Sequence, residues 1–166
     1  MMNRNDIKAC DVLEDSYCGL YCGACEILIA YTKALELNRG VTWEDLPKEF
    51  SSYITEAEVK CLGCKTETVF EGCQRCPIRS CAREKGVEYC IDCEFYPCDL
   101  INQMLEQLIR IKSVLPHTSG IIGNLEEIKK MGRVAWLKHQ KKLWSCPTCG
   151  SRFSWYQNKC TTCRKT

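Results

Sequence analysis

The 166-residue chain has only two histidines, His117 and His139, and both lie apart from its 16 cysteines in the sequence. It has no run of about 18 consecutive apolar residues, which a membrane-spanning helix would need, and its first residues do not resemble a signal peptide. A Gly-rich phosphate loop, an H-E-x-x-H motif and an obvious cysteine–histidine nucleophile pair are also missing. These absences favour a cytoplasmic protein with no membrane segment and a non-catalytic role rather than an enzyme.

Cysteine is the residue that the chain has in excess. Twelve of the 16 cysteines form six C-x-x-C pairs, and in a reducing cytoplasm such pairs indicate metal sites more readily than structural disulfides, which would require export. A single redox-active C-x-x-C pair would not account for six of them. Because the histidines lie apart from the pairs, we expect ligation by thiolate alone, which favours zinc or an iron–sulfur cluster.

The clearest single site lies at the end of the chain, where two C-x2-C knuckles are separated by ten residues. If the intervening residues fold back as a hairpin, the four sulfurs meet at one tetrahedral centre, as in a zinc ribbon. Four thiolates leave no open position for water or substrate, so the predicted zinc is structural. The predicted ligands are Cys146, Cys149, Cys160 and Cys163.

The upstream cysteines predict two or three further sites. Residues 61–98 hold eight cysteines and only short apolar runs, so metal is expected to organise this segment. The spacing allows two arrangements equally well: neighbouring knuckles can share a metal in sequence order, or alternate knuckles can share one in a cross-braced arrangement. The first motif, residues 18–25, leaves three thiolates that need a fourth ligand, for which Cys10 is a candidate. In sequence order the groups are Cys18, Cys22 and Cys25; Cys61, Cys64, Cys73 and Cys76; and Cys81, Cys90, Cys93 and Cys98.

The identity of the upstream metal stays open between zinc and iron. The first motif has the C-x3-C-x2-C spacing of radical S-adenosylmethionine enzymes, but the 141 residues after Cys25 do not alternate strands and helices as the barrel of those enzymes requires. The ferredoxin run C-x2-C-x2-C-x3-C-P is also missing. We expect three to four Zn²⁺ sites in all, with [4Fe–4S] as the upstream alternative, in which case the protein would carry electrons or sense redox state.

Apolar periodicity predicts a mainly α-helical, metal-stabilised fold. A helix is expected over residues 23–38, with a C-cap at Asn38-Arg39-Gly40, and a less regular amphipathic stretch over 43–54. Pro77 predicts the start of a short helix that ends by Gly86.

Two further helices are expected to form a hairpin. One begins at Asp99 and stops at Pro116, and the other begins at a capping box, Asn124 to Glu127, and continues to about residue 143. The predicted organisation is therefore a cysteine-rich multi-metal domain over residues 1–98, the helical hairpin packed on it over 99–143, and a small β zinc ribbon over 144–166.

Charge divides the chain unevenly. Residues 128–166 contain ten Lys or Arg and no Asp or Glu, whereas residues 1–127 contain 13 basic and 21 acidic residues. Residues 129–166 could therefore bind nucleic acid, with five interleaved aromatic side chains available for stacking. The favoured alternative is that the basic face docks on the acidic part or is solvated, and that the aromatics cover the ribbon's own core. The aromatics are Trp136, Trp144, Phe153, Trp155 and Tyr156.

Taken together, the motifs resemble a family of cysteine-rich bacterial and archaeal proteins that is classed as a domain of unknown function. The resemblance spans about residues 17–100 and rests on the ordered series CGLYC-x2-C, C-x-G-C, C-x2-C-x4-CAREKG and C-x2-C-x-FYPC. The segment from Met131 to Gly150 is similar to the ribbon that many members carry. The resemblance implies metal binding by these cysteines and no assigned activity, and Cys10 lies outside the family pattern. We therefore expect a zinc-binding protein with structural sites and a binding or scaffold role toward an unknown protein partner.

Overall fold

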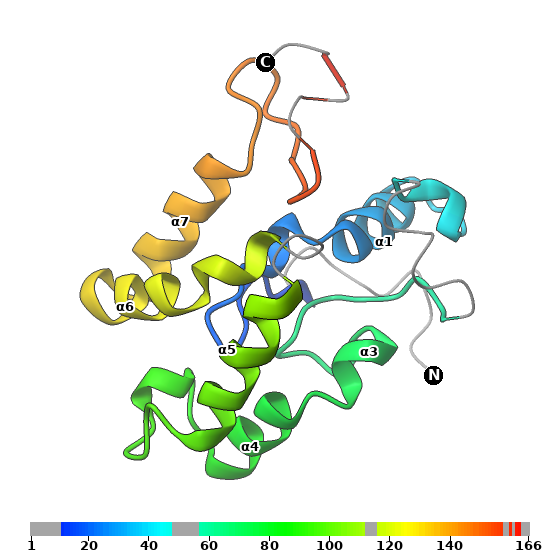
Figure 1. The fold of residues 1–166 in the computed structure, drawn as a ribbon. Coiled ribbons are helices and arrows are strands. Elements are labelled where there is room, and N and C mark those ends of the chain that lie inside the picture. The colour runs from blue at the N-terminus through cyan, green and yellow to red at the C-terminus, as the bar shows by residue number, and fades with distance from the viewer. Residues whose placement is uncertain (1–10, 48–56, 112–115, 158–159, 161, 164–166) are drawn as a thin grey trace.

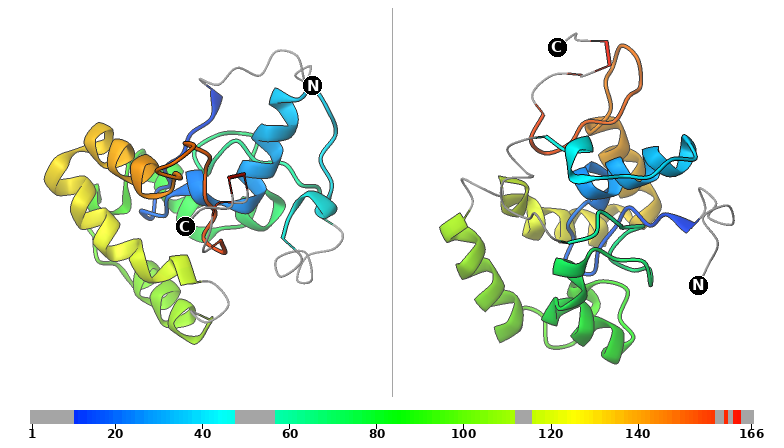
Figure 2. Two further views of the ribbon diagram at one scale, coloured as in Figure 1. Left: turned by 90° about the horizontal axis from the view of Figure 1, so that it is seen from above. Right: turned by 90° about the vertical axis from the view of Figure 1, so that its right-hand side faces the viewer.

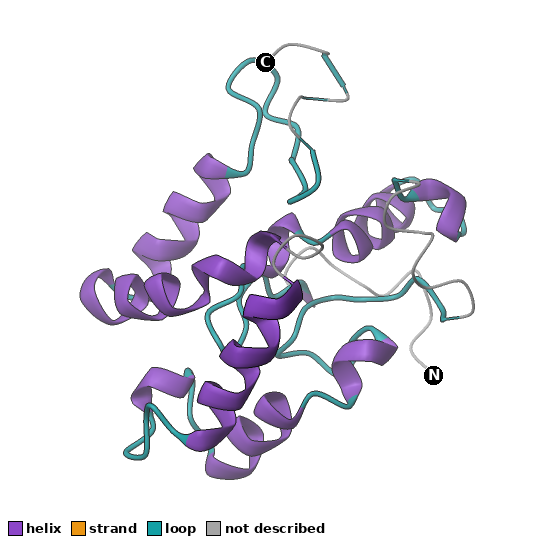
Figure 3. Cartoon of the chain, viewed as in Figure 1, coloured by secondary structure: helices purple, strands orange, loops and turns teal. Residues whose placement is uncertain are grey.

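The computed structural model describes residues 11–47, 57–111, 116–157, 160 and 162–163. These residues form short α-helices and 3-10 helices (η) joined by loops, and Figure 3 draws no strand among them. The mainly α fold class is therefore confirmed. The elements are η3 (Cys22–Ala24), α1 (Glu26–Glu36), η4 (Trp43–Asp45), α3 (Glu71–Gln74), α4 (Pro77–Lys85), η5 (Cys90–Asp92), α5 (Asp99–Ile111), η6 (Pro116–Gly120), α6 (Ile121–Met131) and α7 (Arg133–Leu143).

Helix α1 follows directly from the first cysteine motif and ends where the sequence predicts. Asn38 takes a positive φ of 49°, and its N–H donates to the carbonyl of Leu35 while the N–H of Arg39 donates to the carbonyl of Ala34. This pair of bonds is a Schellman motif, which satisfies carbonyls that the last helical turn leaves without partners. The helix itself begins at Glu26 rather than at residue 23, because residues 22–24 form a 3-10 turn.

Helices α4 and α5 also begin and end where the sequence predicts, except that the end of α5 lies next to residues outside the described ranges. Helix α4 has Pro77 in its first turn, and Gly86 ends the helix with a φ of 64°. Since a left-handed residue at a helix C-terminus is most easily supplied by glycine, this end was readable from the sequence. Helix α5 begins at Asp99 as expected, and Ile101 buries its side chain to 1% exposure.

The predicted second helix of the hairpin is wrong in two respects. The helix begins at Ile121, so Asn124 lies inside α6 rather than at its N-cap, and its side-chain amide donates to the carbonyl of Gly19. The helix is also broken at Gly132, whose φ of 81° and ψ of 158° separate α6 from α7. The segment from 99 to 143 is therefore built from α5, η6, α6 and α7 rather than from a two-helix hairpin (Figure 1).

Two small hydrophobic clusters form the core of the described residues. One joins α1 to the segment after residue 57, and the other joins the motif to α6 and α7, where Trp136 is fully buried with its ring edge-on to Tyr21. Because both clusters are small, the loops between them need other sources of order. The first contains Ile27, Ala30, Leu46, Val59, Cys61, Val69 and Phe70; the second contains Tyr21, Ala24, Tyr89, Leu125, Ile128 and Trp136.

A buried carboxylate, which the sequence analysis did not identify, connects three distant segments. Asp15 is 0% exposed and accepts hydrogen bonds from Lys65 Nζ at 2.8 Å, Tyr89 Oη at 2.6 Å and Arg133 Nε at 3.0 Å. Burial by itself raises the pKa of Asp15, but the hydrogen bonds from its partners outweigh burial and lower the pKa to about 2. Arg133 also lies 3.6 Å from Glu88. Asp15 therefore holds α7 against the cysteine-rich segment.

The structure covers the remaining sequence predictions to different extents. Of the amphipathic stretch at 43–54, the structure describes η4, while residues 48–56 lie outside the described ranges, as does Cys10. In the ribbon, the described residues form an isolated antiparallel bridge between Ser145 and Arg152 rather than the expected β-strands. Within the described ranges, the helices are all too short or too polar to cross a membrane.

Candidate metal centres

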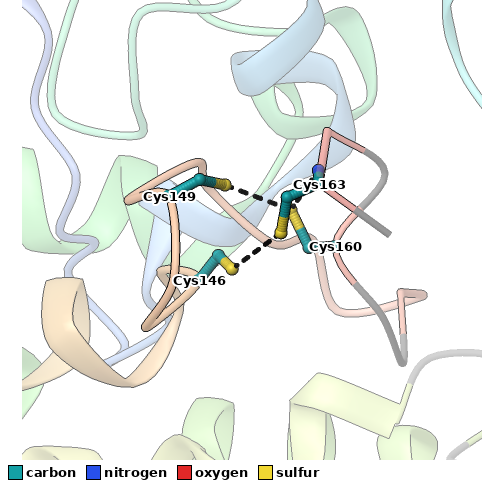
Figure 4. Close-up of side chains that lie close together, drawn as sticks. All are labelled: Cys146, Cys149, Cys160 and Cys163. Atoms are coloured by element: carbon teal, nitrogen blue, oxygen red, sulfur yellow. Dashed lines mark hydrogen bonds between the residues drawn. The ribbon is translucent and has the colours of Figure 1, made fainter. Parts of the chain in front are cut away.

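The ribbon cysteines, Cys146, Cys149, Cys160 and Cys163, come together as predicted. The sulfurs of Cys146 and Cys163 are 3.6 Å apart and those of Cys149 and Cys160 are 3.5 Å apart. Figure 4 shows the two knuckles pointing their sulfurs toward one another across the loop. All four sulfurs lie within 4.8 Å of one another. Zinc–sulfur bonds of about 2.3 Å at the tetrahedral angle place neighbouring sulfurs about 3.8 Å apart, so the geometry fits a single tetrahedral ion.

The thiol pKa values of Cys146 and Cys149, the first knuckle of the ribbon, also suit a metal site. The hydrogen bond with the Ser151 hydroxyl, followed by the backbone N–H of Ser151, lowers the pKa of the Cys149 thiol to about 6. The pKa of Cys146 is lowered as well, first by the backbone N–H of Cys149. A thiol must lose its proton to bind metal, so a lowered pKa favours the ligating form at neutral pH.

The ribbon docks on the first cysteine motif. The N–H of Trp155 donates to the carbonyl of Ala24 at 3.2 Å, the Ser154 hydroxyl donates to Glu26, and Arg152 pairs with Glu14 at 2.8 Å. Burial raises the pKa of Glu26 to about 7. The two views of Figure 2 show the ribbon loop beside the start of α1. The ribbon and the first motif are therefore neighbours although more than a hundred positions separate them in the sequence.

Six upstream cysteines, which we call the central cysteines, gather around the first motif. Burial, followed by the nearby thiols of Cys64, Cys25 and Cys61, raises the pKa of Cys22 well above its usual range. The pKa of Cys73 rises for the same reasons, with Cys25 and Cys61 as its leading neighbours. Cys22 and Cys25 of the first motif therefore lie near Cys61, Cys64 and Cys73, and the pairing of the upstream cysteines into metal sites stays a prediction. The central cysteines are Cys22, Cys25, Cys61, Cys64, Cys73 and Cys76.

The remaining upstream thiols form a second group, which we call the cavity cysteines: Cys81, Cys90, Cys93 and Cys98. All four line one cavity between α4 and the start of α5. Burial, followed by the thiols of Cys18, Cys98, Cys81 and Cys93, raises the pKa of Cys90 to about 12. Cys18 also adds to the raised pKa of Cys64, which places it between the central and the cavity cysteines. The described cysteines are not joined in disulfides.

Gly63 lies between Cys61 and Cys64 and allows this knuckle to pack closely against residue Leu13, which precedes the first motif. Its φ is 119°, and a Cβ at this position would lie 1.8 Å from the carbonyl oxygen of Leu13. Next to Gly63, the N–H of Leu13 donates a backbone hydrogen bond of 2.8 Å to the carbonyl of Leu62. Only glycine fits this close approach, which explains the glycine in the C-x-G-C motif.

The substitution Gly63→Ala is expected to destabilise the protein by about 3 kcal/mol, from the backbone clash and from the left-handed conformation together. Chemical denaturation followed by circular dichroism measures this change. Gly40→Ala is the matched control, because a Cβ at Gly40 would meet no atom within 4 Å. A Gly63→Ala protein as stable as the Gly40→Ala protein would contradict the proposed packing.

These sites define the class of the protein: a cysteine-rich, mainly helical chain with a four-cysteine cluster that could hold a metal ion. The chain matches the family described as Protein of unknown function (DUF3795) over residues 14–103 and belongs to that family. This match confirms the resemblance drawn from the ordered motifs. Comparison with curated proteins and with solved structures gave no match.

The basic C-terminal segment contributes in part to the fold itself. Arg133 pairs with Asp15 and Arg152 pairs with Glu14. Trp136 is fully buried, and Trp155 stacks on His117 with ring centroids 3.6 Å apart. Nucleic-acid binding through residues 129–166 stays a prediction. Among the described residues of this segment, the exposed lysines that could contact phosphate are Lys129, Lys130, Lys138, Lys141 and Lys142.

Proposed function

We propose that this is a non-catalytic metal-binding protein whose ribbon cysteines hold one structural zinc ion. The observation that carries the proposal is the convergence of four sulfurs, with contacts of 3.5 and 3.6 Å, at the spacing of a tetrahedral thiolate site. Four thiolate ligands would complete the coordination of the ion, which leaves no position for a reacting water. The zinc would then stabilise structure rather than supply chemistry.

The role of this zinc would be to attach the ribbon to the first cysteine motif. Closing the tetrahedron orders the loop from residue 150 to residue 157, since the unfolded chain has no preformed site. That loop carries Ser154 and Trp155, which contact Glu26 and Ala24. A metal-held ribbon therefore covers one side of the first motif, and the finished surface would serve as a binding or scaffold surface for a protein partner in the cytoplasm.

Cys146→Ser tests the zinc proposal. The variant is expected to lose about one zinc ion per chain, as measured by metal analysis of the purified protein. It should also lose hydrogen-exchange protection over residues 145–157, because those residues depend on the closed tetrahedron. Thr148→Ser is the matched control: it changes an exposed side chain in the same knuckle and should retain the metal. A Cys146→Ser protein with full zinc content and a protected ribbon would refute the assignment.

A further inference from the structure

The cavity cysteines converge from three separate pieces of the chain. Cys81 lies in α4, Cys90 and Cys93 lie at the start and just after the end of η5, and Cys98 directly precedes α5. Their cavity is lined otherwise by Lys85 and by five apolar residues. The apolar lining consists of Ile78, Ala82, Val87, Leu100 and Ile101. A set of four thiols in one apolar cavity has the composition of a metal-cluster site.

The spacing of these sulfurs differs from that of the ribbon. Among the residues that the structure describes, which include the whole of 57–111, the ribbon cysteines alone bring three or more ligand atoms within 4.8 Å of one another. The cavity that the four thiols line has a volume of about 20 Å³, so little water can enter between the sulfurs. A single zinc ion would draw its four sulfurs to about 3.8 Å. A cluster of four irons separates them further, because each thiolate binds a different iron.

From this geometry we infer that Cys81, Cys90, Cys93 and Cys98 bind a [4Fe–4S] cluster in the cavity between α4 and α5. The inference rests on the proposed metal-binding function of the chain but not on the zinc of the ribbon. The surrounding apolar side chains would keep water away from the cluster, and the exclusion of water is one of the factors that set a cluster's reduction potential.

Lys85 gives this site an electrostatic feature of its own. It lines the cavity, and its ammonium group lies 4.4 Å from the centre of the Phe95 ring. Four thiolates and a [4Fe–4S]²⁺ core carry a net negative charge, which grows by one when the cluster takes up an electron. A cation at the cavity edge therefore favours the reduced state and raises the reduction potential.

The first experiment compares iron and zinc in two variants purified without oxygen. Wild-type protein should be brown, with broad visible absorption. Cys93→Ser should lose about four iron atoms per chain and the matching share of absorption while keeping the ribbon zinc. Cys149→Ser is the matched control and should lose zinc while keeping iron. If Cys93→Ser loses zinc in place of iron, or if wild-type protein contains no iron, the inference is overturned while the ribbon proposal stands.

A second experiment places the cluster in this cavity without removing a ligand. Lys85→Gln should shift the reduction potential of the cluster to more negative values, as measured by titration with dithionite, because the cation near the cluster is gone. Lys142→Gln, an exposed lysine on α7, should leave the potential unchanged. Figure 1 shows α7 and α4 in different parts of the molecule. Equal potentials in the Lys85→Gln and wild-type proteins would show that the cluster lies elsewhere.

Discussion

Complete removal of metal is expected to unfold residues 57–98 while α6 and α7 retain their helical structure. The segment contains eight cysteines and is built from the short helices α3 and α4, the single turn η5 and loops. Helices of this length are marginal without tertiary contacts. Structural zinc sites in small domains contribute on the order of 10 kcal/mol of binding free energy that acts as folding free energy. We therefore expect metal to be the main source of order in this segment, whose helices and turns are short.

The retained part has a different basis for its stability. Helices α6 and α7 pack Leu125, Ile128 and Trp136 against Tyr21 and Ala24 of the first motif as well as against Tyr89, and their own backbone hydrogen bonds do not involve cysteine. Hydrogen exchange read by mass spectrometry should therefore show rapid exchange over 57–98 and slower exchange over 121–143 in metal-free, reduced protein. Reloading with zinc or with iron and sulfide serves as the control. Continued protection of 57–98 in reduced, metal-free protein would contradict the view that metal organises it.

Replacing the buried carboxylate of Asp15 is expected to lower the stability of the protein strongly. Asp15→Asn should lower the free energy of unfolding by about 3 to 5 kcal/mol, the usual cost of removing one partner from a buried ion pair. The loss leaves the ammonium of Lys65 and the guanidinium of Arg133 without their shared counter-charge. The Lys65 side chain is 10% exposed, so water compensates only a small part of this loss.

The same carboxylate predicts a dependence of stability on pH. Since the folded-state pKa of Asp15 is about 2, below the ordinary value of 3.8, its contribution is present in full above the ordinary value. It is lost as the pH falls toward 2. Urea denaturation at several pH values measures both effects. Asp45→Asn is the control, because its pair with Arg39 is exposed and should contribute little to stability. Equal losses in the two variants would contradict the assigned role of Asp15.

The sequence predicted the features that depend on local chemistry. The ends of α1 and α4 followed from Asn38 and Gly86, because a left-handed residue at a helix end is a short-range requirement. The ribbon cysteines followed from their own spacing, since four thiols within 18 residues have few ways to meet. In contrast, the break at Gly132 was missed, because apolar residues recur at helical spacing on both sides of that glycine and predict one continuous helix.

The features that depend on distant segments could not be predicted in the same way. Asp15 is one of 21 acidic residues, and its importance arises from Lys65, Tyr89 and Arg133, which the fold brings to it from 50, 74 and 118 positions away. Asn124 has the spacing of a capping box, but its amide instead contacts the carbonyl of Gly19. The distribution of the upstream thiols into central and cavity groups likewise depends on how the knuckles fold over one another.

The contact between the ribbon and the first motif sets an order for biosynthesis. Ala24 and Glu26 leave the ribosome long before Ser154 and Trp155, which later contact them. Until the ribbon has been synthesised, the first motif is therefore open on the side that the ribbon finally covers. A metal that bound at the first motif would therefore reach it on the nascent chain, before the ribbon is synthesised and closes over it.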